Sequence, residues 1–291
     1  MGLCPSDEPA AMSTLISIGL QHTYLLHEML SFISLHLSYL QPSQKEFYRY
    51  HATELQMHAL RLFNAENVAH GNLREGEKEK NDCLPAFFFS AIIGAHNLHD
   101  AINSEASDVS LYLDRIVKYL KVAKGVMTQI DGPAWNSLAD GPFRGVFSTS
   151  CNIPPPENAK SPTLQRLTSL VEDSSSITSS TLLILLRALS HLSSTYMAHS
   201  ISQSRKDNEY RGSAISALLT WPIRASKEYV ELLEQRRPEA LAILAWWGRL
   251  IEEYRAIWIF GSGGETLVRV IQSLLGSYWE EWLPCAVGQL A

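Results

Sequence analysis

Apolar residues recur every three or four positions along nearly the whole chain, and this spacing constrains its fold more than any other feature. Between Ser13 and Leu40 the apolar positions follow one face of a helix: Leu15, Ile18, Leu25, Leu26, Met29, Leu30, Ile33 and Leu37. A period near 3.6 predicts amphipathic helices, whereas strands need an alternation that no segment shows. The sequence therefore predicts an all-α fold, an antiparallel multi-helix bundle of roughly ten to twelve helices.

Prolines, glycines and capping residues predict where the helices begin and end. Pro42 ends the first helix, and Ser43 with Glu46 forms a capping box for the next. Residues 131–162 are rich in Gly, Pro, Asn and Ser, which predicts one long irregular connection. We expect a single helical domain over residues 1–291 that contains this connection. Its later helices are expected over residues 84–101, 108–124, 163–171, 178–203 and 210–219, and at three further segments started or separated by Pro222, Pro238 and Gly264.

The charge and the cysteines argue against direct DNA recognition. The formal net charge is −6, and nucleic-acid binding normally needs a basic surface. The four cysteines (Cys4, Cys83, Cys151 and Cys285) are too scattered for a zinc cluster or another metal site. No signal peptide and no apolar run long enough to span a membrane is present. We therefore expect no metal, no cofactor and no membrane contact, and a location in the nucleus or cytoplasm.

Aromatic and small residues alternate in the last quarter of the chain, and this pattern predicts an internal apolar cavity. Most of the large rings are expected to fill the core, but small neighbours such as Ala245 and Gly248 leave space between helices. Arg249 and Glu253 are spaced i and i+4, so they form a polar pair on one helix face. Facing inward, this pair would bind the hydroxyl or carbonyl group of an apolar ligand. The predicted ligand-binding residues are Trp221, Trp246, Trp247, Arg249, Glu253 and Tyr254.

Histidines near the middle of two helices suggest acid–base chemistry as an alternative. His96 and His99 share one helix face, while His191 and His199 flank Tyr196 on another helix. The plain interpretation is that His96 and His99 complete an apolar helix and bond to neighbouring backbone. If the protein is an enzyme, the catalytic candidates are His96, His99, His191 and Tyr196.

Four sequence blocks, in order, resemble the fungal-specific transcription-factor domain, the helical ligand-sensing region of fungal zinc-cluster regulators. The first block runs from Tyr24 to Leu37 and the second from Tyr48 to Phe63; the third contains Gly125 and Trp135. The last begins at Trp221-Pro222 and ends at Trp279-Glu280-Glu281-Trp282-Leu283-Pro284. The chain departs from the family in lacking a zinc cluster and in the loose Gly261-Ser262-Gly263-Gly264 stretch, which predicts a turn and lacks the lysine of a phosphate-binding loop.

The resemblance implies a regulator rather than a DNA reader. It implies a pocket for an apolar small molecule such as a sterol, terpenoid or polyketide, and a role in fungal secondary metabolism. Action on transcription would then need a DNA-binding protein partner or a homodimer. Leu274, Leu275, Tyr278 and Trp282 are expected to form an apolar strip for such a partner. The alternative is a repurposed pocket that acts as a cofactor-free cyclase, isomerase or dehydratase on a terpenoid or polyketide intermediate.

Overall fold

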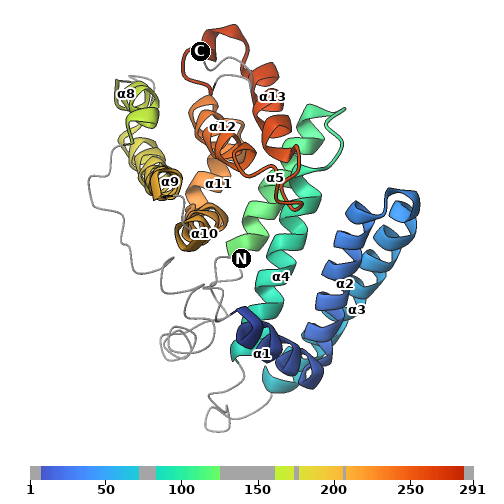
Figure 1. Cartoon of the computed structure of the whole chain (residues 1–291). Helices are drawn as coiled ribbons and strands as arrows, with labels where there is room; N and C mark the ends of the chain where they lie inside the picture. The colour runs from blue at the N-terminus through green and yellow to red at the C-terminus, as the bar shows by residue number, and fades with distance from the viewer. Residues whose placement is uncertain (1–7, 72–82, 125–160, 174–176, 206–207, 285–291) are drawn as a thin grey trace. The chain divides into compact units, whose positions relative to one another are not determined.

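The structure is a computed structural model that describes residues 8–71, 83–124, 161–173, 177–205 and 208–284. This described part contains eleven α-helices and no strand, which confirms the predicted all-α multi-helix fold (Figure 1). Residues 131–160 of the predicted connection lie outside the described residues, as do Cys4, Cys151 and Cys285. The internal cavity remains a prediction.

The chain forms two compact units. Of the described residues, the smaller unit comprises 8–71 and 83–97, and the larger unit comprises 98–124, 161–173, 177–205 and 208–284. Helix α4 (Cys83–Ile102) begins in the smaller unit and ends in the larger one. The single domain expected over residues 1–291 remains a prediction beside these two units.

Helices α2 (Thr23–Leu40) and α3 (Lys45–Gly71) form a long hairpin in the smaller unit (Figure 1). The short helix η1 (Pro42–Gln44) makes the turn between them, so Pro42 does end a helix as the sequence predicts. Ala52 and Ala59 of α3 are buried, and such small side chains let two helices approach closely. Tyr24, Phe63 and Phe89 fill the interior with edge-on and stacked rings whose centroids lie 4.4–5.3 Å apart.

The predicted continuous helix from Ser13 to Leu40 is wrong at one residue. Helix α1 (Glu8–Gln21) ends before His22, whose backbone is extended (φ −122°, ψ 99°), and α2 starts at Thr23. The break lets α1 pack against α2, and a Cβ atom at Gly19 would lie only 2.8 Å from Met29 Sδ. Because the apolar spacing continues through His22, the sequence pattern contains no sign of the break.

The larger unit contains the end of α4 and the helices α5 (Val109–Ala123), α8 (Gln165–Asp173), α9 (Ser179–Arg205), α10 (Asn208–Arg224), α11 (Lys227–Glu234), α12 (Pro238–Glu252) and α13 (Gly263–Leu275). Short helices η3 (Pro162–Leu164) and η4 (Ser277–Trp279) complete it. Helix α12 is buried on almost every side, as expected for the central helix of a core. The largest fully buried side chains of the core in this unit are Tyr112, Trp221, Tyr229, Trp247 and Phe260.

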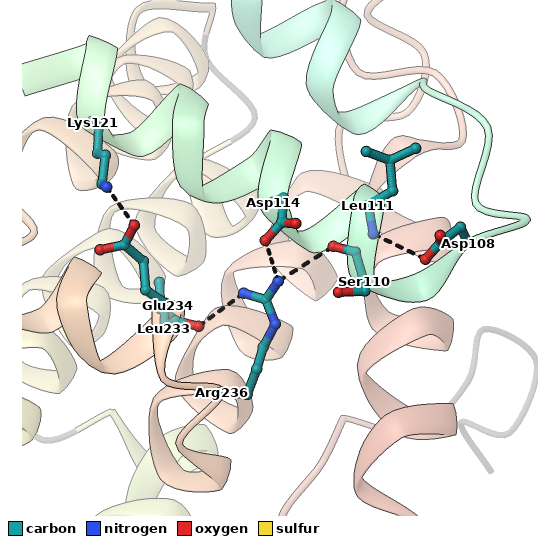
Figure 2. Close-up of polar contacts among 8 residues, drawn as sticks. All are labelled: Asp108, Ser110, Leu111, Asp114, Lys121, Leu233, Glu234 and Arg236. Atoms are coloured by element: carbon teal, nitrogen blue, oxygen red, sulfur yellow. Dashed lines mark hydrogen bonds and ion pairs between the residues drawn. The ribbon is translucent and has the colours of Figure 1, made fainter.

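The junction between α11 and α12 is fixed to α5 by Arg236 (Figure 2). Arg236 adopts a left-handed backbone (φ 56°), and its N–H donates to Leu233 O while Arg237 N–H donates to Leu232 O, the pattern of a Schellman helix end. This position normally favours glycine. Here the Arg236 side chain donates to Leu233 O, Ser110 O and the Asp114 carboxylate, and Lys121 pairs with Glu234 nearby. These bonds to α11 and α5 explain why arginine is tolerated there.

Pro222 does not start or separate a helix as predicted; it lies inside the last turn of α10. A proline lacks the N–H that would donate to the carbonyl four residues earlier, here that of Leu218. Trp247 Nε1 of α12 donates to Leu218 O at 3.2 Å instead. The tertiary bond replaces the missing helical one, so the helix continues to Arg224, and α11 starts only after Ser226, whose side chain caps Tyr229 N–H.

Candidate ligand-binding site

A cluster of polar side chains lies between α9 and α12 of the larger unit. Tyr196 Oη of α9 donates to Trp246 O at 2.9 Å, and a hydrogen bond of 2.9 Å joins His199 Nδ1 to Tyr254 Oη. Arg249 Nη2 lies 2.6 Å from Glu253 Oε1 on the α12 side. We call these five side chains, Tyr196, His199, Arg249, Glu253 and Tyr254, the α9–α12 cluster.

Burial keeps most of this cluster uncharged. Burial raises the pKa of Tyr196 well above its ordinary value, although the neighbouring Arg249 opposes the shift. Burial also raises the pKa of Tyr254 to about 12, against the pull of Arg211. The pKa of His199 is lowered, mainly by burial and further by Arg249, while Glu253 opposes. Near neutral pH the cluster therefore offers two phenols, a neutral imidazole and one ion pair.

Part of the cluster is accessible to solvent. Tyr196 and Tyr254 are buried and His199 and Arg249 are partly buried, whereas Glu253 is exposed. Trp246 lies beside it, with its ring 6.2 Å from the Tyr196 ring, and its Nε1 donates to Trp282 O at 2.8 Å. A hydroxyl or carbonyl group could thus be met by donors and acceptors next to an apolar ring.

The predicted ligand-binding residues divide into two groups. Arg249, Glu253 and Tyr254 belong to the cluster, as does the catalytic candidate Tyr196, and Trp246 lies beside it. Trp221 and Trp247 are instead stacked in the core, with ring centroids 5.4 Å apart, and their Nε1 atoms donate to Ala188 O and Leu218 O. Both are almost completely buried, so they are packing residues of the core.

His96 lies in the smaller unit, next to a buried acid. Its Nδ1 is 3.4 Å from Glu28 Oε1 and 3.4 Å from Ser31 Oγ, and Ser31 Oγ donates to Ala52 O. Burial raises the pKa of Glu28, while His96 and Gln56 act in the opposite direction. His96 and Glu28 are both almost fully buried, so this pair has no direct access for a substrate.

His99 and His191 have different surroundings again. His99 Nδ1 donates to Ile259 O at 3.1 Å, and Asn103 Nδ2 donates to the same carbonyl at 3.0 Å. This arrangement fits the plain interpretation of a histidine that bonds to nearby backbone. His191 has a lowered pKa because it is buried and lies near Arg224 and Arg187. The role of each as an acid or base remains a prediction.

Two neighbours of the cluster were missed by the sequence analysis. Ser202 hydrogen-bonds to Tyr254 and Arg211 lies near it, and both lower the pKa of that phenol. Ser202 follows Tyr196 and His199 at steps of three along α9, so all three fall on one helix face. That polar spacing is a signal that could have found Ser202. Arg211 carries no such signal, because it comes from a different helix, α10.

The other candidate sites give less support for the binding of a ligand or a metal ion. The Gly263–Glu265 backbone starts α13, and Glu252 Oε2 already accepts the Glu265 N–H at 3.2 Å, so the protein's own carboxylate occupies this helix end. Among the described residues, no three His, Cys, Asp or Glu side chains gather in a way that could hold a metal ion. A surface hollow is lined by residues 42–47 and by none of the predicted ligand-binding residues.

The predicted partner strip is exposed in part. Leu274 and Tyr278 are exposed (45% and 75%), whereas Leu275 and Trp282 pack partly against the core. The rings of Tyr278, Trp279 and Trp282 contact one another at centroid distances of 5.6–6.2 Å. Tyr278 and Leu274 are therefore the members that a partner could touch first.

No family model, curated protein or solved structure matches this chain. Of the helices that the structure describes, none is both long and apolar enough to cross a membrane. The fold and the cluster thus define an all-α protein in which a partly accessible cluster of polar side chains lies among apolar side chains.

Proposed function

We propose that this protein is a ligand-responsive regulator of transcription that acts through protein partners. Its ligand would be an apolar small molecule with a hydroxyl or carbonyl group, of the sterol, terpenoid or polyketide class. Sequence resemblance to the ligand-sensing domain of fungal zinc-cluster regulators supports this proposal, as does the all-α fold. A function in fungal secondary metabolism follows from the same resemblance.

One observation carries the proposal furthest: Arg249 is partly buried and forms, with the exposed Glu253, an ion pair that acts electrostatically on Tyr196 and His199. Surface ion pairs contribute little to stability, typically about 0–1 kcal/mol. A pair set against neutral phenols and an apolar ring is better suited to orienting one polar group of a ligand. The exposed Leu274 and Tyr278 offer an apolar surface for a protein partner.

An enzymatic function is the second candidate, favoured by the 2.9 Å bond between His199 and Tyr254. A neutral imidazole bonded to a phenol can pass a proton, as a cofactor-free cyclase, isomerase or dehydratase requires. The binding residues would be the same in both cases. The two functions differ in what disrupting the cluster would abolish. A regulator would lose the dependent transcripts, whereas an enzyme would lose the conversion of an intermediate.

The test is deletion of the coding sequence in its native host, followed by complementation. Transcripts of neighbouring genes and metabolites are measured from the same cultures. We expect the deletion to lower dependent transcripts at least about tenfold, and Arg249→Gln to restore them only partly because the ligand's polar group loses a charged partner. The wild-type chain should restore them fully.

The matched control is Lys227→Gln. Lys227 and Glu231 form another i,i+4 pair, 3.7 Å apart, but on the exposed face of α11. This variant should complement like the wild type. Unchanged transcripts with an accumulated, unrearranged intermediate would reject the regulator and support the enzyme. Unchanged transcripts and unchanged metabolites would reject both.

A further inference from the structure

Helix α2 has no charged side chain on its surface. Its only charged residue is Glu28, which is fully buried (0% exposed). The hairpin partner α3, in contrast, carries Lys45, Glu46, Arg49, Glu54 and Arg61. A helix with a solvated face normally bears charges there, and a helix that is apolar on all sides is normally covered. The outward face of α2 therefore has the composition of an interface.

The exposed apolar residues of α2 are spaced for helix pairing. Five of the wholly or partly exposed ones follow one another at steps of four, three, four and three: Leu26, Leu30, Ile33, Leu37 and Leu40. Tyr39 is also exposed (56%) and lies off this line. Leu30, Ile33 and Leu40 are 44%, 51% and 57% exposed, and Leu26 and Leu37 are partly exposed. This spacing is the a/d repeat of a coiled-coil seam. We call these five residues the α2 seam.

The seam lies opposite the side of α2 that the hairpin uses. Leu25, Glu28, Ser31, Leu35 and Ser38 are buried, and each lies roughly half a helical turn from a seam residue. The seam is thus additional to the packing of α2 against α3. Helix α1 approaches the seam at its first residue, since a Cβ atom at Gly19 would lie 4.0 Å from Leu26 Cα. Because α2 is already folded against α3, association would not have to supply the cost of forming the helix.

We propose that the α2 seam binds the α2 seam of a second copy of this chain, so that the protein is a dimer paired through this helix. A seam with the a/d repeat is complementary to itself, since each side chain can enter a hole formed by the partner's seam. The flanking positions are His27, Met29, Ser34, His36 and Gln41. None of them is an acidic or permanently basic residue, so two identical faces do not repel each other. This pairing does not rest on the proposed ligand site, which lies in the other unit.

The test is sedimentation velocity of the full chain over a range of micromolar concentrations at neutral pH. We expect a reversible monomer–dimer equilibrium in the wild type. Ile33→Glu should weaken dimerisation at least about 100-fold, because a charge would be buried in the seam without a partner. Ile33 is half exposed in the monomer, so the variant should keep its helical circular dichroism. Its melting temperature should match that of the wild type at concentrations low enough for the wild type to be monomeric, because dimerisation itself raises the melting temperature.

The matched control is Leu183→Glu, at an apolar residue of α9 that is 69% exposed; it should dimerise like the wild type. A charge swap identifies the occupant: Ile33→Glu and Ile33→Lys should each remain monomeric alone and form a heterodimer when mixed. A monomeric wild type, or a dimer that Ile33→Glu leaves intact, would overturn the proposal. So would a mixture of the two variants that stays monomeric.

Discussion

At the scale of single residues, the Glu28 carboxyl predicts how the stability of the protein depends on pH. Its burial raises its pKa, so between its ordinary and its raised pKa the folded chain binds more protons than the unfolded chain. Stability then falls as the pH rises through that window. Glu28→Gln removes the ionisation and should stabilise the protein at pH 8 by about 1 kcal/mol, with a smaller gain at pH 4.5.

The measurement is the melting temperature of both proteins between pH 4.5 and pH 8. A gain of about 1 kcal/mol corresponds to about 2–4 °C for a chain of this size. The control is Glu54→Gln on the exposed side of α3, which should leave the wild-type pH profile unchanged. A loss of stability in Glu28→Gln at pH 8 would mean that the ionised Glu28–His96 pair is favourable and that burial has been overcome.

The sequence predicts much about single residues, but not what surrounds them. The i,i+4 spacing of Arg249 and Glu253 predicted their ion pair, and the aromatic pattern included Trp246 and Tyr254. The same pattern included Trp221 and Trp247, which stack in the core. Local spacing shows which residues lie on the same face of a helix. Whether that face is buried depends on helices that are distant in the sequence, so burial is known only from the structure.

At the scale of helices, most elements follow from the sequence because helix formation depends on nearby residues. Pro238 begins α12 and Asp108 caps α5 by accepting the Leu111 N–H. The two errors, His22 and Pro222, share one cause. In each case a tertiary contact decides the boundary: α1 packs back on α2 at Gly19, and the Trp247 indole satisfies the carbonyl that Pro222 leaves free.

The Pro222–Trp247 relation predicts a coupling between two helices. Trp247→Phe removes the donor to Leu218 O and leaves a small void, which should cost about 2–4 kcal/mol of unfolding free energy. Pro222→Ala in that background supplies a backbone N–H to the same carbonyl and should recover about 1 kcal/mol. A double-mutant cycle by denaturant unfolding measures this coupling.

Trp221→Phe provides the control for this cycle. Trp221 is equally buried and stacks on Trp247, but its Nε1 donates to Ala188 O, a carbonyl that no proline has deprived of its helical donor. Its coupling to Pro222→Ala should be much smaller. Equal coupling in both cycles would show that ring packing, and not the Leu218 carbonyl, links α10 to α12.

At the scale of the whole molecule, α4 couples the unfolding of the two compact units. The helix begins at Cys83 in the smaller unit and ends at Ile102 in the larger one. Unfolding one unit alone would have to break this helix between Asn97 and Leu98, about a turn and a half before its end, and expose backbone groups there. We therefore expect both units to unfold in one cooperative transition, as the sequence-based expectation of a single domain requires.

Calorimetry of two variants already described tests this cooperativity, because each acts in a different unit. Glu28→Gln changes the smaller unit and Trp247→Phe changes the larger one. If unfolding is cooperative, each variant shifts the entire heat absorption peak, upward for Glu28→Gln at pH 8 and downward for Trp247→Phe. If the units unfold independently, Trp247→Phe would split the peak and leave one component at the wild-type temperature. Glu28→Gln would then move that component alone, which would place the boundary between two domains within α4.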